Sequence, residues 1–186
     1  MDSTPRKGSQ HNMFNPIDVR VDENIFDTET ACTCNVIPHG VNTQGVMGAG
    51  FAGLVANQYP QVKAEYQAAC RAGNLIPGTT QVVHVTFSTL FIANVASQQK
   101  PGRDARAEWL ATGLDDMYAA MRERPATTFD VRLPLIGAGI GGLSPTVSVQ
   151  TITAAARRNA ANHIRTTLYL RSTDRVYTEA VSALTI

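Results

Sequence analysis

The chain has 186 residues, 44% of them hydrophobic and 17% charged, and it is therefore long enough to bury one full core. Lys and Arg number 16 against 15 for Asp and Glu, which gives a formal net charge of +1. This balance excludes a broad electrostatic surface for nucleic acid or for anionic membranes, so any phosphate must be bound locally.

The apolar runs are all far shorter than the roughly 20 residues that cross a bilayer, and the N-terminus lacks the apolar centre of a signal peptide. We therefore expect a cytoplasmic protein that does not bind membranes. Cys32, Cys34 and Cys70 have no second Cys/His pair at zinc-finger spacing. We interpret them as reduced thiols and expect no metal site.

The polar residues 1–16 contain two prolines and one glycine and show no apolar period, which predicts a disordered tail. One domain should follow over residues 17–186. Its β-type runs predict strands over 17–21, 31–38, 81–86, 89–95, 129–136 and 166–171. Segments between and after them predict helices over 49–59, 61–72, 104–122, 145–162 and 174–184.

This alternation of strands and helices is typical of an α/β layer fold. The third and fourth runs are separated by a short polar stretch and should form a hairpin, which would make the sheet mixed. The helix over 104–122 places Leu110, Leu114, Met117, Tyr118 and Met121 on one face, as expected for core packing. Ser144 followed by Pro145 is a helix-start signal.

Two glycine-rich loops each join a predicted strand to a predicted helix. The first includes 39-HGVNTQGVMGAG-50 and the second is 137-GAGIGGLS-144. In a mostly parallel sheet both loops would lie at the carboxyl ends of strands, where open α/β folds bind ligands. Backbone N–H groups and helix N-termini there suit a diphosphate without a cationic side chain. Tight turns remain the alternative interpretation of either loop alone.

The second loop also satisfies the dinucleotide-binding pattern G-x-G-x-x-G at Gly137, Gly139 and Gly142. That pattern expects an acidic residue about 20 residues further on, at the end of the next strand. Here the next predicted strand ends near Arg171 and the first acid beyond it is Asp174. The context of a dinucleotide site is therefore missing.

Three pieces of the sequence resemble macrodomains, the ADP-ribose-binding family. They are 23-ENIFD-27, 39-HGVNTQGVMGAGFA-52 followed by 57-NQYP-60, and 133-LPLIGAGIGGL-143, in the family's order. The branch they resemble includes terminal ADP-ribose protein glycohydrolases and ADP-ribose-1''-phosphate phosphatases. The resemblance covers residues 17–171 and implies a three-layer α/β/α macrodomain with a mixed, mostly parallel sheet of about six strands.

The resemblance also implies roles for individual residues. Asn24 and the backbone of Ile25 would hold adenine, and Asn42 would hydrogen-bond the distal ribose. The two loops would wrap the distal ribose and the diphosphate through Gly45, Val46, Met47, Gly48, Ala49, Gly50, Gly137, Ala138, Gly139, Ile140, Gly141 and Gly142. A turn role for Asn42 and a core role for Met47 and Phe51 stay open as alternatives.

In the glycohydrolase branch, a Lys after the fourth strand and an acid in the second loop carry the reaction. This chain has Ser97 or Gln98 at the first place and Ser144 after Leu143 at the second. We therefore expect a water oriented by a polar side chain, with His39, Asn42 and Gln98 as candidate catalytic residues.

The other polar residues near these motifs have plainer interpretations. For His39 the alternative is a satisfied, partly buried histidine. Asp104 is expected to cap the helix that begins beside it. His84 and His163 are interpreted as structural or surface residues.

The expected function is ADP-ribose binding with hydrolysis of an ADP-ribosyl derivative at the distal ribose. The reaction would be de-ADP-ribosylation, deacetylation of O-acetyl-ADP-ribose or dephosphorylation of ADP-ribose-1''-phosphate. We expect a monomer that needs no cofactor and whose partner is ADP-ribose or an ADP-ribosylated molecule. The alternative is a non-catalytic ADP-ribose reader or scavenger, which the missing Lys and acid favour.

Overall fold

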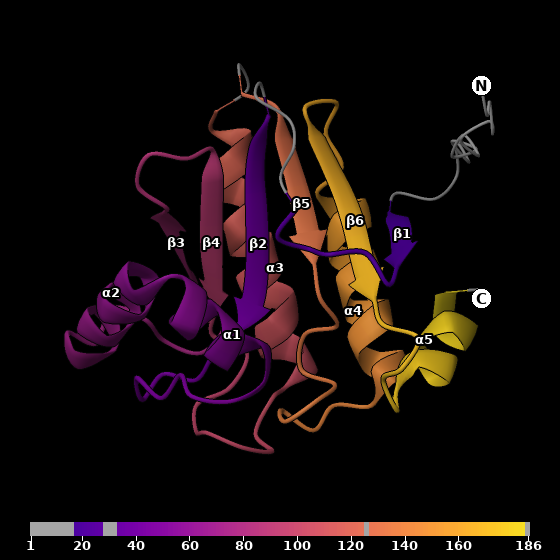
Figure 1. Cartoon of the computed structure of the whole chain (residues 1–186), viewed down its shortest axis with the longest axis horizontal. Coiled ribbons are helices and arrows are strands. Elements are labelled where there is room, and N and C mark those ends of the chain that lie inside the picture. Colours follow the sequence, from indigo (N-terminus) through magenta and orange to yellow (C-terminus); the bar gives the residue numbers. More distant parts are fainter. Residues whose placement is uncertain (1–16, 28–32, 125–126, 185–186) are drawn as a thin grey trace, which may run out of the picture.

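Six strands form one sheet between layers of helices in the computed structural model, which describes residues 17–27, 33–124 and 127–184 (Figure 1). The tail expected over residues 1–16 lies outside the described residues. The strands are β1 (Asp18–Val21), β2 (Cys34–Gly40), β3 (Thr80–His84), β4 (Leu90–Val95), β5 (Phe129–Leu133) and β6 (Ile164–Leu170). The helices are α1 (Gly50–Gln58), α2 (Pro60–Arg71), α3 (Ala107–Arg122), α4 (Pro145–Arg158) and α5 (Tyr177–Leu184).

The sheet order is β1-β6-β5-β2-β4-β3. β3 pairs with β4 in antiparallel fashion, and the other neighbouring pairs are parallel. The predicted hairpin and the mixed, mostly parallel sheet are thus confirmed. The order differs from the 3-2-1-4-5-6 arrangement of dinucleotide-binding folds, so the G-x-G-x-x-G pattern does not mark a Rossmann unit.

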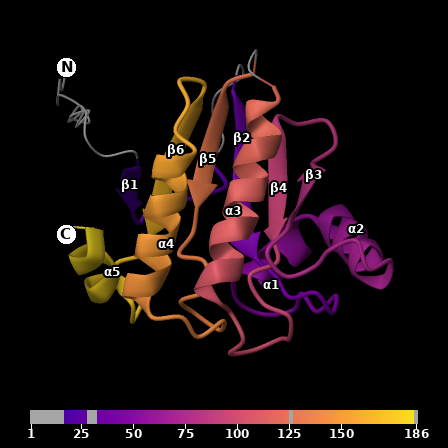
Figure 2. The ribbon, with the colours of Figure 1, turned by 180° about the vertical axis from the view of Figure 1, so that it is seen from behind.

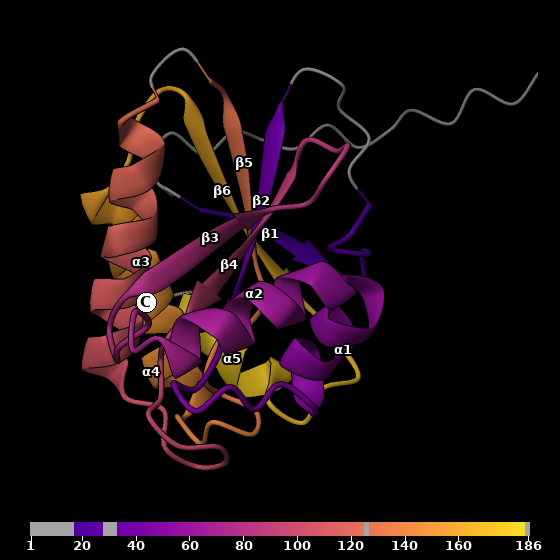
Figure 3. The ribbon, with the colours of Figure 1, turned by 90° about the vertical axis from the view of Figure 1, so that its left-hand side faces the viewer.

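Helices cover both faces of the sheet and make the predicted three layers. α3 and α4 lie behind it (Figure 2), and α1 and α2 lie on the opposite face (Figure 3). Residues alternate between the two faces along each strand: Val36 of β2 packs towards α3 and α4, whereas Ile37 packs towards α1 and α2. This alternation places His39 on the α1/α2 face, because it lies two residues after Ile37.

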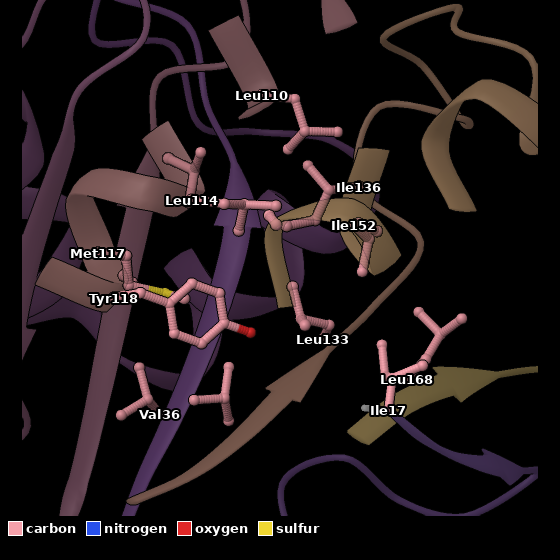
Figure 4. Packing of buried hydrophobic residues seen from close by; sticks show 14 of the residues in the cluster. Ile17, Val36, Leu110, Leu114, Met117, Tyr118, Leu133, Ile136, Ile152 and Leu168 are labelled. Carbon is pink, nitrogen blue, oxygen red and sulfur yellow. The ribbon is translucent and has the colours of Figure 1, made fainter. Parts of the chain in front are cut away.

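The largest hydrophobic cluster lies between the sheet and helices α3 and α4 (Figure 4). It contains the whole predicted apolar face of α3, whose five residues are each at most 3% exposed. Ile152 of α4 and Leu133 of β5 complete its centre. Burying this face holds α3 against the sheet through the hydrophobic effect, and the core prediction from spacing is confirmed.

The starts of two helices test the capping predictions, of which one is confirmed and the other is wrong. Ser144 caps α4 as expected, because its Oγ accepts from the backbone N–H of Val147 at 3.2 Å. The prediction for Asp104 was wrong: its Oδ2 accepts from the backbone N–H groups of Gln99 and Lys100 at 2.9 and 2.8 Å. Asp104 therefore closes the turn before α3, and the helix begins later, at Ala107.

The carboxyl ends of β2 and β5 differ from the predicted strand ends, because pairing with neighbouring strands determines where each strand stops. β2 continues to Gly40 because its register with β4 includes His39 opposite Asn94 and Gly40 opposite Val95. β5 ends at Leu133, just before Pro134, which has no N–H for the ladder.

Candidate functional site

The two glycine-rich loops emerge at a reversal of strand order. They follow β2 and β5, which are parallel neighbours at the middle of the sheet. From β2 the chain continues to β3 and then β4 on one side of the sheet, and from β5 it continues to β6 on the other. Carboxyl ends of strands at such a switch point are where ligands of open α/β sheets bind.

Both loops line one hollow of about 290 Å³ above this point. The end of β2, the first loop, the start of α1, the segment after β4 and the second loop all contribute. Among the predicted site residues it is lined by His39, Asn42, Val46, Gly48, Ala49, Gly50, Gln98, Gly137, Gly139, Ile140 and Gly141. The loops therefore face a common space, as the sequence predicts.

A larger hollow of about 810 Å³ adjoins the first. The two share the lining residues Phe51, Pro134, Leu135 and Gly139. The predicted site residues Ile25 and Ala138 lie at the larger hollow, whose wall also includes Tyr169. Together the two hollows form a divided groove across the carboxyl end of the sheet.

Asn42 is 5% exposed, and its amide is occupied within the first loop and its support. Its Oδ1 accepts from the backbone N–H of Gln44 at 2.9 Å, from that of Val46 at 3.2 Å and from the hydroxyl of Tyr66 at 3.0 Å. Its Nδ2 donates to the carbonyl of Val46 at 2.6 Å. The side chain therefore sets the loop's shape beside the hollow.

His39 is 1% exposed and hydrogen-bonded through one ring nitrogen. Its Nε2 lies 2.8 Å from Oδ1 of Asn94 on β4. Its Nδ1 is buried and has no hydrogen-bond partner among the described residues. Burial lowers the pKa of His39 to about 4, against the smaller opposing effect of the Asn94 bond, so the ring is neutral at pH 7.

Gln98 and Ser97 lie where β4 leads into the following loop. The amide nitrogen of Gln98 donates to the carbonyls of Lys100 at 2.7 Å and Gly102 at 3.2 Å, which ties this side chain to its own loop. Ser97 is fully buried, lines the smaller hollow and has no partner for its Oγ among the described residues. Two buried polar atoms with unused hydrogen-bonding capacity thus belong to residues that line one hollow.

The segment predicted to hold adenine is held in place by β5. Asn24 is exposed, and its Oδ1 accepts from the backbone N–H of Phe26 at 3.1 Å. Arg132 on β5 is 7% exposed and donates to the carbonyls of Ile25 and Asp27. This contact places Ile25 at the larger hollow, whereas Asn24 lines neither hollow of the groove.

Three further predicted residues also lie outside the divided groove. Met47 is 3% exposed in a cluster with Tyr66, which is the core alternative. Gly45 lines a separate shallow hollow beside α2 and accepts from Gln67. Gly142 lies under Arg103.

Asn94, Tyr66 and Arg132 also support the site, and none of them was among the predicted site residues. Asn94 is an isolated polar residue in the otherwise apolar strand LFIANV, which is a usable signal of a buried polar contact. Tyr66 and Arg132 lie 24 and 107 residues from the loop groups that they bind, and no local pattern announces such contacts.

Within the described residues no cluster of three or more His, Cys, Asp or Glu side chains could hold a metal. Cys34 and Cys70 are free thiols, and Cys32 lies outside the described residues. No helix within that part of the chain is long and apolar enough to cross a membrane.

No protein-family model matches the chain. Among curated proteins, it is 30% identical over 105 residues to the DNA ADP-ribosyl glycohydrolases of Mycobacterium tuberculosis and Thermus aquaticus. Each match covers 55% of this chain and 29% of the relative, so the chain spans less than a third of the relatives' length.

Solved structures match over most of the chain. The macrodomain of Thermus aquaticus DarG is 26% identical with a TM-score of 0.65, and the match covers 83% of this chain and 97% of that one. The macrodomain of Mycobacterium tuberculosis DarG is 24% identical with a TM-score of 0.66, over 82% and 97%. Thermosipho africanus DarTG in complex with ADP-ribose is 19% identical with a TM-score of 0.71, over 89% and 45%.

The mixed sheet, its helix layers and these neighbours define the class: the chain has the macrodomain fold. Within that class it is similar to the macrodomains of bacterial DarG proteins.

Proposed function

We propose that this macrodomain binds ADP-ribose in the divided groove and hydrolyses an ADP-ribosyl derivative at the distal ribose. The observation that carries the proposal is the meeting of the two glycine-rich loops around one hollow at the switch point. A diphosphate there would be bound by backbone N–H groups. The distal ribose would occupy the smaller hollow, and the adenosine would occupy the larger one beside Ile25 and Tyr169.

The hydrolytic step uses a water as nucleophile. Its oxygen forms a bond to the anomeric carbon of the distal ribose, the bond to the linked group breaks with its electron pair, and the leaving group ends with the proton. Because its pKa is lowered to about 4, His39 is a weak base, so we assign it to orienting a water or a ribose hydroxyl through Nδ1. Asn42 shapes the loop that surrounds this position.

Among possible linked groups we favour a DNA base, because the curated relatives are DNA ADP-ribosyl glycohydrolases. The loop after β4 supports this choice. Lys100 and Arg103 are exposed on it, Arg103 lines the larger hollow, and the neighbouring Asp104 carboxylate is bound to backbone N–H groups. These two cations provide a local site for a flanking phosphate although the chain is nearly neutral overall.

The activity test compares four substrates: an ADP-ribosylated DNA oligonucleotide, a peptide ADP-ribosylated on glutamate, O-acetyl-ADP-ribose and ADP-ribose-1''-phosphate. We expect ADP-ribose to be released from the oligonucleotide. Chromatography of the nucleotide products measures this release. The variant Lys100→Ala removes a side chain that lines neither hollow, so it should lower activity on the oligonucleotide and keep affinity for free ADP-ribose. Release from the peptide or the small molecules but not from the oligonucleotide would overturn the DNA assignment.

A non-catalytic reader or scavenger is the second candidate, and the state of the polar side chains favours it. The amide nitrogen of Gln98 is bound within its own loop, and His39 is a weak base. A reader binds ADP-ribose, measured by calorimetry, but releases no product from any of the four substrates. Product formation from one of them excludes this candidate.

We further propose that the protein acts as a monomer in the cytoplasm. Light scattering after size-exclusion chromatography and cell fractionation test these two statements.

A further inference from the structure

A line of three hydrogen-bonded side chains crosses the sheet from α2 to His39. Gln81, Asn94 and His39 lie on the adjacent strands β3, β4 and β2, and Asn94 is the register partner of both others. Gln81 Nε2 donates to the backbone carbonyl of Glu65 at 3.2 Å, and Asn94 Nδ2 donates to Gln81 Oε1 at 3.0 Å. The last bond joins Asn94 Oδ1 to His39 Nε2 at 2.8 Å.

The direction of every bond in this line follows from its first member. A backbone carbonyl only accepts, so the Gln81 amide must present Nε2 to Glu65 and Oε1 to Asn94. Asn94 must then present Oδ1 to the imidazole. An oxygen in that place requires the proton of a neutral imidazole to be on Nε2, so Nδ1 carries a lone pair.

The surroundings of Nδ1 indicate what its lone pair could bind. His39 lines the smaller hollow, and Nδ1 is buried without a partner among the described residues. Leaving a buried acceptor unpaired has a free-energy cost. A ligand hydroxyl or a water bound in the hollow would remove that cost.

We propose that Gln81 and Asn94 are positioning residues that hold His39 in the Nε2–H tautomer, so that Nδ1 accepts a hydrogen bond from a hydroxyl group of the bound sugar or from its water. The inference rests on the proposed function for the identity of the ligand. The tautomer itself does not depend on that function and is measured on the free protein.

The first measurement is nitrogen-15 NMR of the histidine rings at pH 7, with His39 assigned by comparison with His39→Gln. We expect a protonated Nε2 and an unprotonated Nδ1. Gln81→Leu, which lies outside the hollow, should populate the Nδ1–H tautomer, and Asn94→Asp should keep Nε2–H because a carboxylate still accepts there. Glu65→Gln is the matched control, because only the backbone carbonyl of Glu65 takes part.

A proton on Nδ1 in the parent protein, or a tautomer that Gln81→Leu leaves unchanged, overturns the inference. Thermal unfolding of each variant shows whether it is folded before its spectrum is interpreted.

The second measurement adds ADP-ribose. The Nδ1 resonance of His39 should move on binding, and Gln81→Leu should weaken ADP-ribose affinity about two- to tenfold, as expected for one lost neutral hydrogen bond. Binding by calorimetry without movement of Nδ1 overturns the acceptor role alone. Absence of any ADP-ribose binding overturns the proposed function and the acceptor role with it. The tautomer measured on the free protein still shows whether Gln81 and Asn94 position His39.

Discussion

At the scale of single residues, buried amides and rings determine the shape of the groove. The Asn42 side chain makes four hydrogen bonds to the loop and to Tyr66, and the His39 ring is held by Asn94. Each of these side chains links the hollow to an element behind it. Replacing one should therefore alter the geometry of the hollow as well as remove a contact.

We expect Asn42→Ala to weaken ADP-ribose binding by about 1–3 kcal/mol, because the groups that Asn42 binds lose a buried partner. Isothermal titration calorimetry measures this change. The neighbouring Gln44 is exposed, so Gln44→Ala is the control and should retain parent affinity. An unchanged isotherm for Asn42→Ala would refute its role in shaping the site.

His39 should make folding stability fall as pH drops from about 6.5 to about 4. In this window the unfolded chain takes up a proton on the ring and the folded protein does not, since its pKa is depressed. The loss should reach roughly 3 kcal/mol at the acid end. Urea unfolding at several pH values measures it, and His39→Leu should be less pH-dependent. Equal pH dependence in both proteins would contradict the burial of a neutral ring.

At the scale of elements, two glycines of the second glycine-rich loop are required for different reasons. Gly137 has a φ of 85°, and a Cβ there would meet Leu143 Cδ1 at 2.7 Å. A Cβ at Gly139 would meet no protein atom within 4 Å, although Gly139 lines both hollows. The backbone requires the first glycine, and we infer that the ligand requires the second.

The pair Gly137→Ala and Gly139→Ala separates these two requirements. Gly137→Ala should lower stability by about 1–3 kcal/mol through left-handed strain and the contact with Leu143. Gly139→Ala should leave stability unchanged or raise it by about 0.4–1 kcal/mol. In calorimetry Gly139→Ala should nevertheless bind ADP-ribose more weakly, because the added methyl group would occupy the hollow. Full affinity in Gly139→Ala would show that the ligand does not approach there.

At the scale of the whole molecule, the sheet and α3 with α4 form the frame on which the loops are held. Leu110, Leu114 and Met117 of α3 are fully buried against the sheet. The loops after β2 and β5 start from strands anchored in the same core through Val36 and Leu133. A substitution in this core should therefore lower the stability of the fold, and it should affect ligand binding only indirectly.

Leu114→Ala should lower the free energy of unfolding by about 2–5 kcal/mol, because it leaves a cavity under α3. Leu54→Ala is the matched control: Leu54 is 50% exposed on α1, so its truncation should cost no more than about 0.5 kcal/mol. Chemical denaturation of both variants measures the difference. Similar costs for the two would contradict the placement of the core.

The sequence by itself determined the fold class, the strand and helix order, the core face of α3 and the two loops that meet at the hollow. These features depend on local periodicity and on glycine patterns, which neighbouring residues express directly. Tertiary structure decided which polar side chains already have hydrogen-bond partners within the protein. Asp104 closes a turn, Gln98 binds its own loop, and His39 is neutral beside Asn94, since each depends on groups that folding brings together.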